Sequence, residues 1–241
     1  MELRPGYREW APPPALRPAV SCLWTSVVAT GDPTIVLPDG CIDLIWQRGE
    51  GAFIAGPDTG PAPSALPAGS MLVGVRLRPG AGGPALGLPL AELRDQRVDL
   101  ADARPDLARL PGDLPPGVAL SRLIDLTAGL AATGPPDPLV RQAARLLAAS
   151  GERTDELARE LGVSERQFRR RCLDAVGYGP KTLQRVLRFR RFVTRLDAAD
   201  DRLDLALVAA ETGYADQAHL TRESVRLAGL PPTALARARR G

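Results

Sequence analysis

The sequence predicts an α+β chain with more than one domain. A small β-rich, barrel-like N-terminal domain with flanking helices precedes an all-α domain of two helix-turn-helix units joined by a long helix. Before Leu139 the chain holds 17 of its 24 glycines and 21 of its 24 prolines. That part carries 11 Arg against 15 Asp and Glu, a net charge of −4, whereas the rest has a net charge of +7. The basic part also contains an internal repeat, which favours a duplicated unit.

Length and composition limit the class of protein. With 241 residues, of which 44% are hydrophobic, the chain can form one or two ordinary cores. No apolar run approaches the ~20 residues that a membrane helix needs. The start of the chain, residues 1–5, lacks the short apolar core of a signal peptide. We therefore expect a cytoplasmic protein with no membrane partner.

Few residues are suited to catalysis or metal binding. The cysteines Cys22, Cys41 and Cys172 are too scattered for a disulfide framework or a zinc site, and His219 is the single histidine. Residues 1–138 contain no Ser/His/Asp set, no GxGxxG and no phosphate-binding loop. We expect no enzymatic activity, no metal and no cofactor.

The first half is predicted to form short strands separated by turns. Runs of β-branched and aromatic residues between Gly and Pro clusters are typical of strands. They predict strands at residues 20–28, 34–37, 41–46, 52–55 and 71–78. In the third strand Ile42 and Trp46 share one face, and Asp43 lies on the other among apolar neighbours.

Helical spacing replaces this pattern after residue 83. Recurring leucines predict a helix at residues 118–131, and a Gly/Pro cluster then ends it. The change in charge falls at the same point. We therefore expect a β-rich domain at residues 1–134, a Pro/Gly linker at 135–138 and a helical domain at 139–241.

The helical domain contains two copies of one unit, predicted at residues 154–177 and 205–229. Gly162 in the first copy corresponds to Gly213 in the second, 51 residues later. Each copy is expected to be two helices joined by a tight turn. In the first, Gly162 ends one helix, and Ser164 opens the next with Gln167 as its partner in a capping box.

The second helix of the first unit has one buried and one basic face. Phe168 and Cys172 face inward at helical spacing, which places three arginines together on the opposite side. These are Arg166, Arg169 and Arg170. Arginine on such a helix can bond guanine O6 and N7 in the major groove or bind phosphates. A solvated charged face is the alternative, and the turn chemistry around the helix argues against it.

The second unit repeats this division. Leu220 faces inward while Gln217, Thr221 and Arg222 face outward, and Gln is the usual reader of adenine. His219 lies in the same helix, and we expect it to pack or to bond a phosphate without reading bases.

Residues 181–197 are predicted to form the helix that joins the units. One side is apolar, and the other carries Arg185, Arg188, Arg190, Arg191 and Arg195. Over the 16 residues from 181 to 196, such a helix spans ~24 Å. It is therefore suited to hold two recognition helices about one DNA turn, ~34 Å, apart.

Several segments of this domain form a recognisable set. They are Glu156-Leu157-Ala158, Gly162-Val163-Ser164, Gly177-Tyr178-Gly179-Pro180 and residues 213–222. With them, residues 139–240 resemble the DNA-binding domain of the AraC/XylS family of bacterial transcription regulators. The resemblance implies a sequence-specific regulator whose partner is double-stranded DNA. The DNA-reading positions that it implies are Arg166, Arg169, Arg170, Gln217, Ala218, Thr221 and Arg222.

Two positions depart from the family pattern, in which both are usually Phe. They are Cys172 and Ser224. We expect rotated or shallower packing there, and a backbone partner for the Ser224 hydroxyl.

The N-terminal half resembles a small domain that precedes this module in actinobacterial regulators. Residues 36–46, 55–59 and 74–80 carry the resemblance. It implies that the domain senses a small-molecule effector or pairs subunits into a homodimer. The candidate effector-binding residues are Trp24, Asp43, Trp46, Arg76 and Arg78. Aromatic walls suit an apolar ligand, and they suit a plain core equally well.

An enzyme-like front half fused to a DNA-binding module is the alternative function. Asp39, Asp43 and Asp58 could perform acid–base work on a small molecule. Cys41 could sense oxidants if positive neighbours activated its thiol, although a buried structural thiol is the simpler interpretation.

Overall fold

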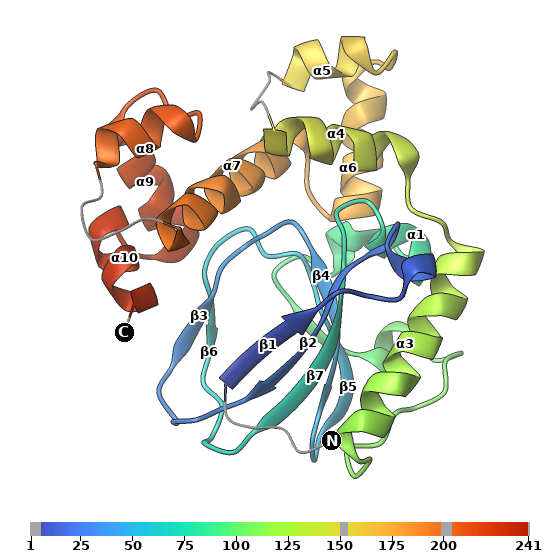
Figure 1. The fold of residues 1–241 in the computed structure, drawn as a ribbon. Coiled ribbons are helices and arrows are strands. Elements are labelled where there is room, and N and C mark those ends of the chain that lie inside the picture. The colour runs from blue at the N-terminus through green and yellow to red at the C-terminus, as the bar shows by residue number, and fades with distance from the viewer. Residues whose placement is uncertain (1–5, 150–153, 199–203, 241) are drawn as a thin grey trace.

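The computed structural model describes residues 6–149, 154–198 and 204–240. A β-rich N-terminal half is followed by a helical C-terminal half (Figure 1). This arrangement confirms the predicted fold class. Residues 1–5, from which we argued against a signal peptide, lie outside the described part.

Six strands form one antiparallel sheet in the order β1-β2-β7-β4-β5-β8. In that order they are Gly6–Trp10, Val20–Val27, Met71–Leu77, Ile42–Gln47, Gly51–Ala55 and Arg97–Asp99. The sheet is open, with β1 and β8 at its edges. A second sheet pairs β3 (Thr34–Val36) with β6 (Ala62–Ser64).

The five predicted strands are confirmed, and three short strands were missed. β1 is exposed along its whole length, so it shows no alternation of apolar and polar residues. β6 contains Pro63, which argues against a strand in the sequence. β8 is only three residues long, and pairing with β5 holds it in place.

One face of the large sheet packs against α3 (Pro116–Thr133), which contains the predicted helix 118–131 (Figure 1). Leu44, Ile54 and Val75 are fully buried in this core. Trp46 is also fully buried, and its indole N–H donates to the carbonyl of Pro111 at 2.8 Å. The short helices of this half are η1 (Pro14–Leu16), α1 (Gly82–Leu86), η2 (Leu90–Glu92) and α2 (Leu100–Ala103).

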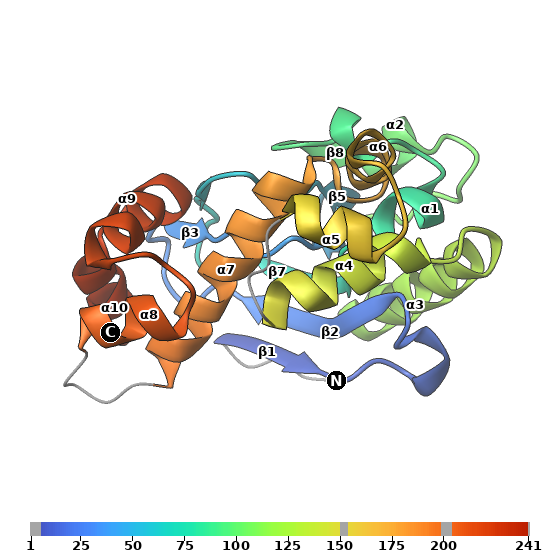
Figure 2. The same cartoon turned by 90° about the horizontal axis from the view of Figure 1, so that it is seen from above.

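The C-terminal half consists of helices around a second core. They are α4 (Pro138–Ala149), α5 (Thr154–Glu160), α6 (Glu165–Val176), α7 (Pro180–Asp197), α8 (Leu205–Glu211), α9 (Gln217–Ala228) and α10 (Pro232–Arg240). α7 runs from the α4–α6 group to the α8–α10 group (Figures 1 and 2). Its fully buried side chains, Phe189 and Phe192 among them, join the two groups into one core.

The segment predicted as a linker is fixed at several points. The N–H of Asp137 donates to the carbonyl of Gly80 at 2.9 Å. Its carboxylate accepts bonds from the N–H groups of Leu139 and Val140 at 2.9 and 3.0 Å. Arg171 of α6 binds the same carboxylate through two bonds of 2.7 and 2.6 Å. One aspartate therefore starts α4 and ties α6 to the junction.

The end of α6 packs directly on the N-terminal half. A Cβ on Gly83 of α1 would lie 2.1 Å from the carbonyl oxygen of Asp174. Gly177, with φ of +90°, approaches the backbone of η2 so closely that a Cβ would lie 2.8 Å from the carbonyl oxygen of Leu90. Backbones this close admit only glycine. The two halves are therefore in tight contact at the first helix-turn-helix unit.

Among the described helices, none combines the length with the apolar character that crossing a membrane requires.

We expect Gly83→Ala to destabilise the chain by about 1–3 kcal/mol, because the added methyl forces α1 and α6 apart. Chemical denaturation with urea measures this free energy of unfolding.

The control is Gly129→Ala in α3, where a Cβ meets nothing within 4 Å. There we expect stabilisation by about 0.5–1 kcal/mol, because alanine is the better helix former. Equal stability of the two variants would contradict the close contact between α1 and α6.

Candidate nucleic-acid interface

The turn of the first unit is fixed by the residues that the sequence indicates. Gly162 adopts φ of +69° between α5 and α6. The hydroxyl of Ser164 accepts a bond from the N–H of Gln167 at 3.2 Å. The Gln167 side chain accepts one from the N–H of Ser164 at 3.0 Å. This capping box satisfies two otherwise free donors and sets where α6 begins.

The outer face of α6 is basic and unpaired. Phe168 and Cys172 are buried beneath it. Arg166, Arg169 and Arg170 are all exposed. Within the described part of the chain none of them has an ion pair or a hydrogen-bond partner. Their guanidinium groups are therefore available to an anionic partner.

The second unit is built in the same way from different residues. Asp204 caps α8 by accepting bonds from the N–H groups of Ala206 and Leu207. Gly213 turns the chain with φ of +83°. Asp216 caps α9 by accepting a bond from the N–H of His219 at 2.6 Å. Both helix starts thus follow from short polar side chains.

The outer face of α9 carries the predicted reading positions. Gln217, Ala218 and Arg222 are exposed, and Thr221 is half-buried. The hydroxyl of Thr221 donates to the carbonyl of Gln217 at 2.9 Å. His219 packs edge-on against Tyr214, with ring centroids 5.3 Å apart. This packing matches the expectation for that histidine.

The side chains at the two positions that depart from the family pattern are both buried. Cys172 is fully buried in the C-terminal core. Ser224 is fully buried as well, and its hydroxyl donates to the carbonyl of Leu230 at 2.7 Å. The predicted backbone partner of Ser224 is therefore confirmed, and it joins α9 to the start of α10.

The arginines of α7 mostly hold the second unit in place. Arg185 binds Glu223 of α9 through bonds of 2.8 and 3.0 Å. Arg188 lies over the ring of Tyr214, 4.8 Å from its centroid. Arg195 pairs with Glu211 of α8 at 2.8 Å. The sequence shows this side of α7 as a basic edge, and its partners appear only in the fold.

Arg191 continues this pattern, because it donates to the carbonyls of Ala149 and Thr212 at 2.8 and 3.2 Å. Arg190 is exposed and has no hydrogen bond or ion pair with another described residue.

Three of the candidate effector residues meet on the other face of the large sheet. Asp43 accepts a bond from the indole N–H of Trp24 at 2.7 Å, and Arg76 binds it at 3.2 and 3.3 Å. Glu9 and Asp39 also lie within 3.3 and 3.6 Å of Arg76. Burial raises the pKa of Asp43 to about 6, against the opposing charge of Arg76. The polar groups of Trp24, Asp43 and Arg76 therefore find their hydrogen-bond partners within this cluster.

The other two candidates lie elsewhere, so the five residues do not form one site. Trp46 points to the opposite face, into the core under α3. The alternation of β4 already required this separation from Asp43. Arg78 donates to the carbonyls of Arg17 and Val20, both at 3.0 Å, and so holds a loop.

The cysteines are buried and free. Burial raises the pKa of Cys22 to about 11 and that of Cys172 to about 12, and it raises the pKa of Cys41 well above its ordinary value. A thiol reacts as its thiolate. Burial thus favours the structural interpretation of Cys41 over a sensing one. In the described ranges no group of three or more metal-ligating side chains is placed to hold an ion.

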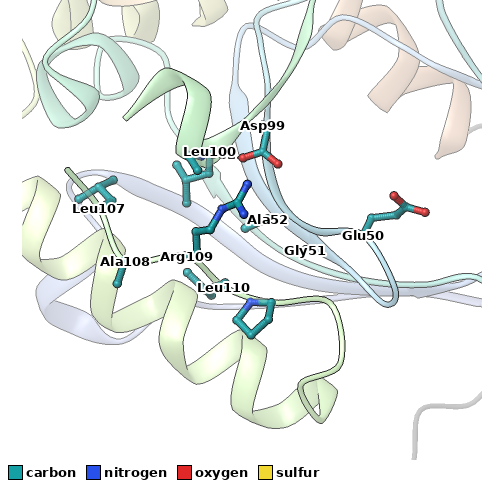
Figure 3. Close-up of a pocket in the computed structure, with 11 residues that line it drawn as sticks. Glu50, Gly51, Ala52, Asp99, Leu100, Leu107, Ala108, Arg109 and Leu110 are labelled. Carbon is teal, nitrogen blue, oxygen red and sulfur yellow. Dashed lines mark hydrogen bonds between the residues drawn. The ribbon is translucent and has the colours of Figure 1, made fainter. Parts of the chain in front are cut away.

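A cavity of about 170 Å³ lies in the N-terminal half, between the start of β5 and residues 107–111 (Figure 3). Glu50, Asp99 and Arg109 contribute its charges. Leu100, Leu107 and Leu110 line it with apolar surface. The Asp99 carboxylate already accepts a bond from the N–H of Ala101 at 2.7 Å. All of the lining residues belong to the N-terminal half.

Comparison with known proteins gives the class of the C-terminal half. Residues 157–238 match the family of helix-turn-helix domains, so this half is a DNA-binding domain. It is a helix-turn-helix domain of the AraC type, as the resemblance of the sequence implied. Residues 8–99 match a family described as a domain of unknown function, DUF6597.

Solved structures of ToxT from Vibrio cholerae are similar in fold. The structure from strain O395 has a TM-score of 0.47 and 10% identity, and covers 86% of this chain and 94% of that chain. A P21 crystal form gives 0.49 and 10%, with coverage of 89% and 97%. ToxT of strain SCE256 with bound unsaturated fatty acid gives 0.46 and 11%, with coverage of 86% and 91%. No protein of curated function matches the sequence.

We expect Glu223→Gln to lower the free energy of unfolding by about 1–2 kcal/mol at pH 7, because it weakens charge-assisted bonds from Arg185. Burial raises the pKa of Glu223, but the bonds and charge of Arg185 and the charge of Arg188 outweigh it and lower that pKa below 4.5. The contribution is therefore present above the unfolded pKa and is lost as pH falls through the lowered value. The difference in the free energy of unfolding between the wild type and Glu223→Gln should therefore be smaller at pH 4 than at pH 7. Urea denaturation at both pH values measures it.

Glu211→Gln is the matched control, since its pair with Arg195 is about 40% exposed on both sides. We expect a loss of about 0–1 kcal/mol there. A loss at Glu223 no larger than at Glu211 would show that the α7–α9 pair does not hold the second unit.

Proposed function

We propose that this chain is a sequence-specific transcription regulator that reads two neighbouring major-groove segments, one with α6 and one with α9. Arg166, Arg169 and Arg170 bind bases or phosphates in one segment. Gln217, Ala218, Thr221 and Arg222 do so in the other, where Ala218 offers only a methyl for contact with thymine. Such a regulator works in the cytoplasm, where the chromosome of a bacterium lies.

The observation that carries this proposal is the contrast between the arginines of α6 and those of α7. Most arginines of α7 are engaged by carboxylates, carbonyls or an aromatic ring of the second unit. Those of the outer α6 face have no partner within the described residues. A charged side chain without an internal partner on a recognition helix is placed for an external one.

The N-terminal half contacts both units, which supports the proposal that it influences their relative position. It contacts the first unit through α1 and η2. It reaches the second unit at the loop that contains Gly60, where a Cβ would lie 3.7 Å from the carbonyl of Arg226 in α9. In this proposal a small-molecule effector acts on the N-terminal half. The proposal also has two copies of the chain pair through the N-terminal half. Light scattering on the full chain measures whether it forms this dimer.

Selection of DNA sites from a pool of randomised duplexes tests the reading positions. We expect the wild-type chain to select two conserved segments about one helical turn, ~10 base pairs, apart. Arg166→Ala with Arg170→Ala should relax one segment and leave the other, because each lost arginine–guanine pair costs about 1–3 kcal/mol. Gln217→Ala with Arg222→Ala should relax the second segment only.

Arg237→Ala is the control, because this exposed arginine of α10 lies off both recognition helices. It should leave both segments unchanged. If the α6 double variant bound the selected site as tightly as wild type, with the same salt dependence, the assignment of its arginines would be wrong.

A further inference from the structure

The side chain of Arg191 in α7 binds two helix ends that lie on opposite sides of the C-terminal half. One terminal nitrogen of its guanidinium donates to the carbonyl of Ala149, at the C-terminal end of α4, at 2.8 Å. The other donates to the carbonyl of Thr212, the C-cap of α8, at 3.2 Å. α4 packs against α6 of the first unit, and α8 belongs to the second unit. One guanidinium therefore connects the two units.

Helix ends, and not carboxylates, stabilise this guanidinium. The last carbonyls of a helix lack partners within it and carry partial negative charge, so two such ends attract a cation placed between them. Burial, and next the charge of Arg188, lower the pKa of Arg191, yet a guanidinium stays charged in proteins. Among the described residues Arg191 has no ion pair of the kind that holds Arg185 and Arg195. Its position is therefore set by the two carbonyls.

The carbonyl of Thr212 lies at the start of the turn that leads from α8 to α9. Gly213 follows with φ of +83°, and a Cβ there would lie 3.1 Å from a terminal nitrogen of Arg191. Arg188 donates to the carbonyl of Gly213 at 3.5 Å and lies over the ring of Tyr214. Two arginines of α7 thus contact this turn, and Arg191 also connects it to α4.

The opposite end of α4 is bound to the first recognition helix. Asp137 starts α4 and accepts bonds of 2.7 and 2.6 Å from Arg171 of α6. The 12 residues of α4 span ~18 Å. Val140 and Leu147 are fully buried in the C-terminal core, so the helix is held along its length. α4 is therefore a rigid rod with α6 bound at its start and the second unit bound at its end.

We propose that α4 and Arg191 form a brace between the two units, and that Arg191 is a positioning residue that fixes the spacing of the two DNA segments the chain binds. The inference rests on the proposed function, because spacing matters only to a chain that reads two segments. α7 joins the units along a single line, and α4 lies beside it (Figure 2). A second connection beside α7 restrains rotation of the second unit about the axis of α7.

The geometry of DNA makes this restraint measurable. One base pair added between the segments moves the second segment by about 3.4 Å and turns it by about 34° around the DNA axis. Recognition helices in a fixed arrangement cannot follow both changes. With a looser connection the units follow more easily, but they bind more weakly at the best spacing, because binding through linked units depends on how well the linkage matches the span.

Duplexes that carry the two segments selected by the wild-type chain test the brace. The distance between the segments is shortened by one base pair or lengthened by one or two, and affinity is measured by fluorescence anisotropy at constant salt. We expect wild-type affinity to fall about 10- to 100-fold for one base pair, because a misplaced α9 loses base contacts. For Arg191→Ala we expect about 2- to 10-fold weaker binding at the best spacing and a fall of less than about 5-fold per base pair. Arg191→Lys, which keeps the charge without the planar fork, should lie between the two.

Arg195→Ala is the matched control. Arg195 also lies on α7 and pairs with Glu211 of α8 at 2.8 Å, but within the described ranges it makes no bond to α4. This variant should keep the spacing dependence of the wild-type chain. Duplexes that carry one segment each report on the units separately, and Arg191→Ala should bind both of them as the wild-type chain does. A change in spacing dependence alone then does not reflect unfolding.

Three results would overturn the brace. The first is an unchanged spacing dependence in Arg191→Ala. The second is an equal broadening in Arg195→Ala, which would assign the effect to any contact between α7 and α8. The third is a loss of binding to the second segment alone by both Arg191→Ala and Arg191→Lys, which would make Arg191 a requirement for folding of the second unit. A wild-type chain that selects only one segment contradicts the proposed function instead, so the two failures are distinguishable.

Discussion

The close contact between the end of α6 and the N-terminal half is the constraint on which the rest of the structure depends. Gly83 and Gly177 allow backbones to approach to distances that no side chain permits. Asp137 adds a charged clamp, since it starts α4 and binds Arg171 of α6. The recognition helix of the first unit is therefore oriented by the N-terminal half as much as by its own domain, and its arginine face points where that contact allows.

The second unit is held in a different way. Buried phenylalanines of α7 give it a shared core, but polar groups set its angle. Arg185 and Glu223, Arg188 and Tyr214, and the bonds from Arg191 lie between α7 and this unit. Partly exposed polar contacts are weaker and easier to exchange than close backbone packing. Of the two recognition helices, α9 is therefore the one whose position a ligand can change at lower cost.

Local chemistry made much of this predictable. The capping box at Ser164, the left-handed glycines and the inward Phe168 are short-range features, so the sequence alone indicates the units and their outer faces. Partners distant in sequence were not predictable: nothing in the sequence pairs Arg185 with Glu223 or Arg171 with Asp137. The alternation along β4 separated Trp46 from Asp43 in advance, so the grouping of both in one effector site overlooked a signal that was present. The sequences of β1 and β6 show no pattern that predicts a strand.

The opposite charges of the two halves explain only a small part of how the halves hold together, the pair of Asp137 with Arg171. Their tightest contacts are between backbones and apolar groups, and much acidic charge of the N-terminal half is used internally, as at Arg76 with Asp43, Asp39 and Glu9. Positive charge therefore stays unneutralised on the outer face of α6, where Arg166, Arg169 and Arg170 are exposed. This face points outward from a recognition helix, as binding to a long polyanion requires.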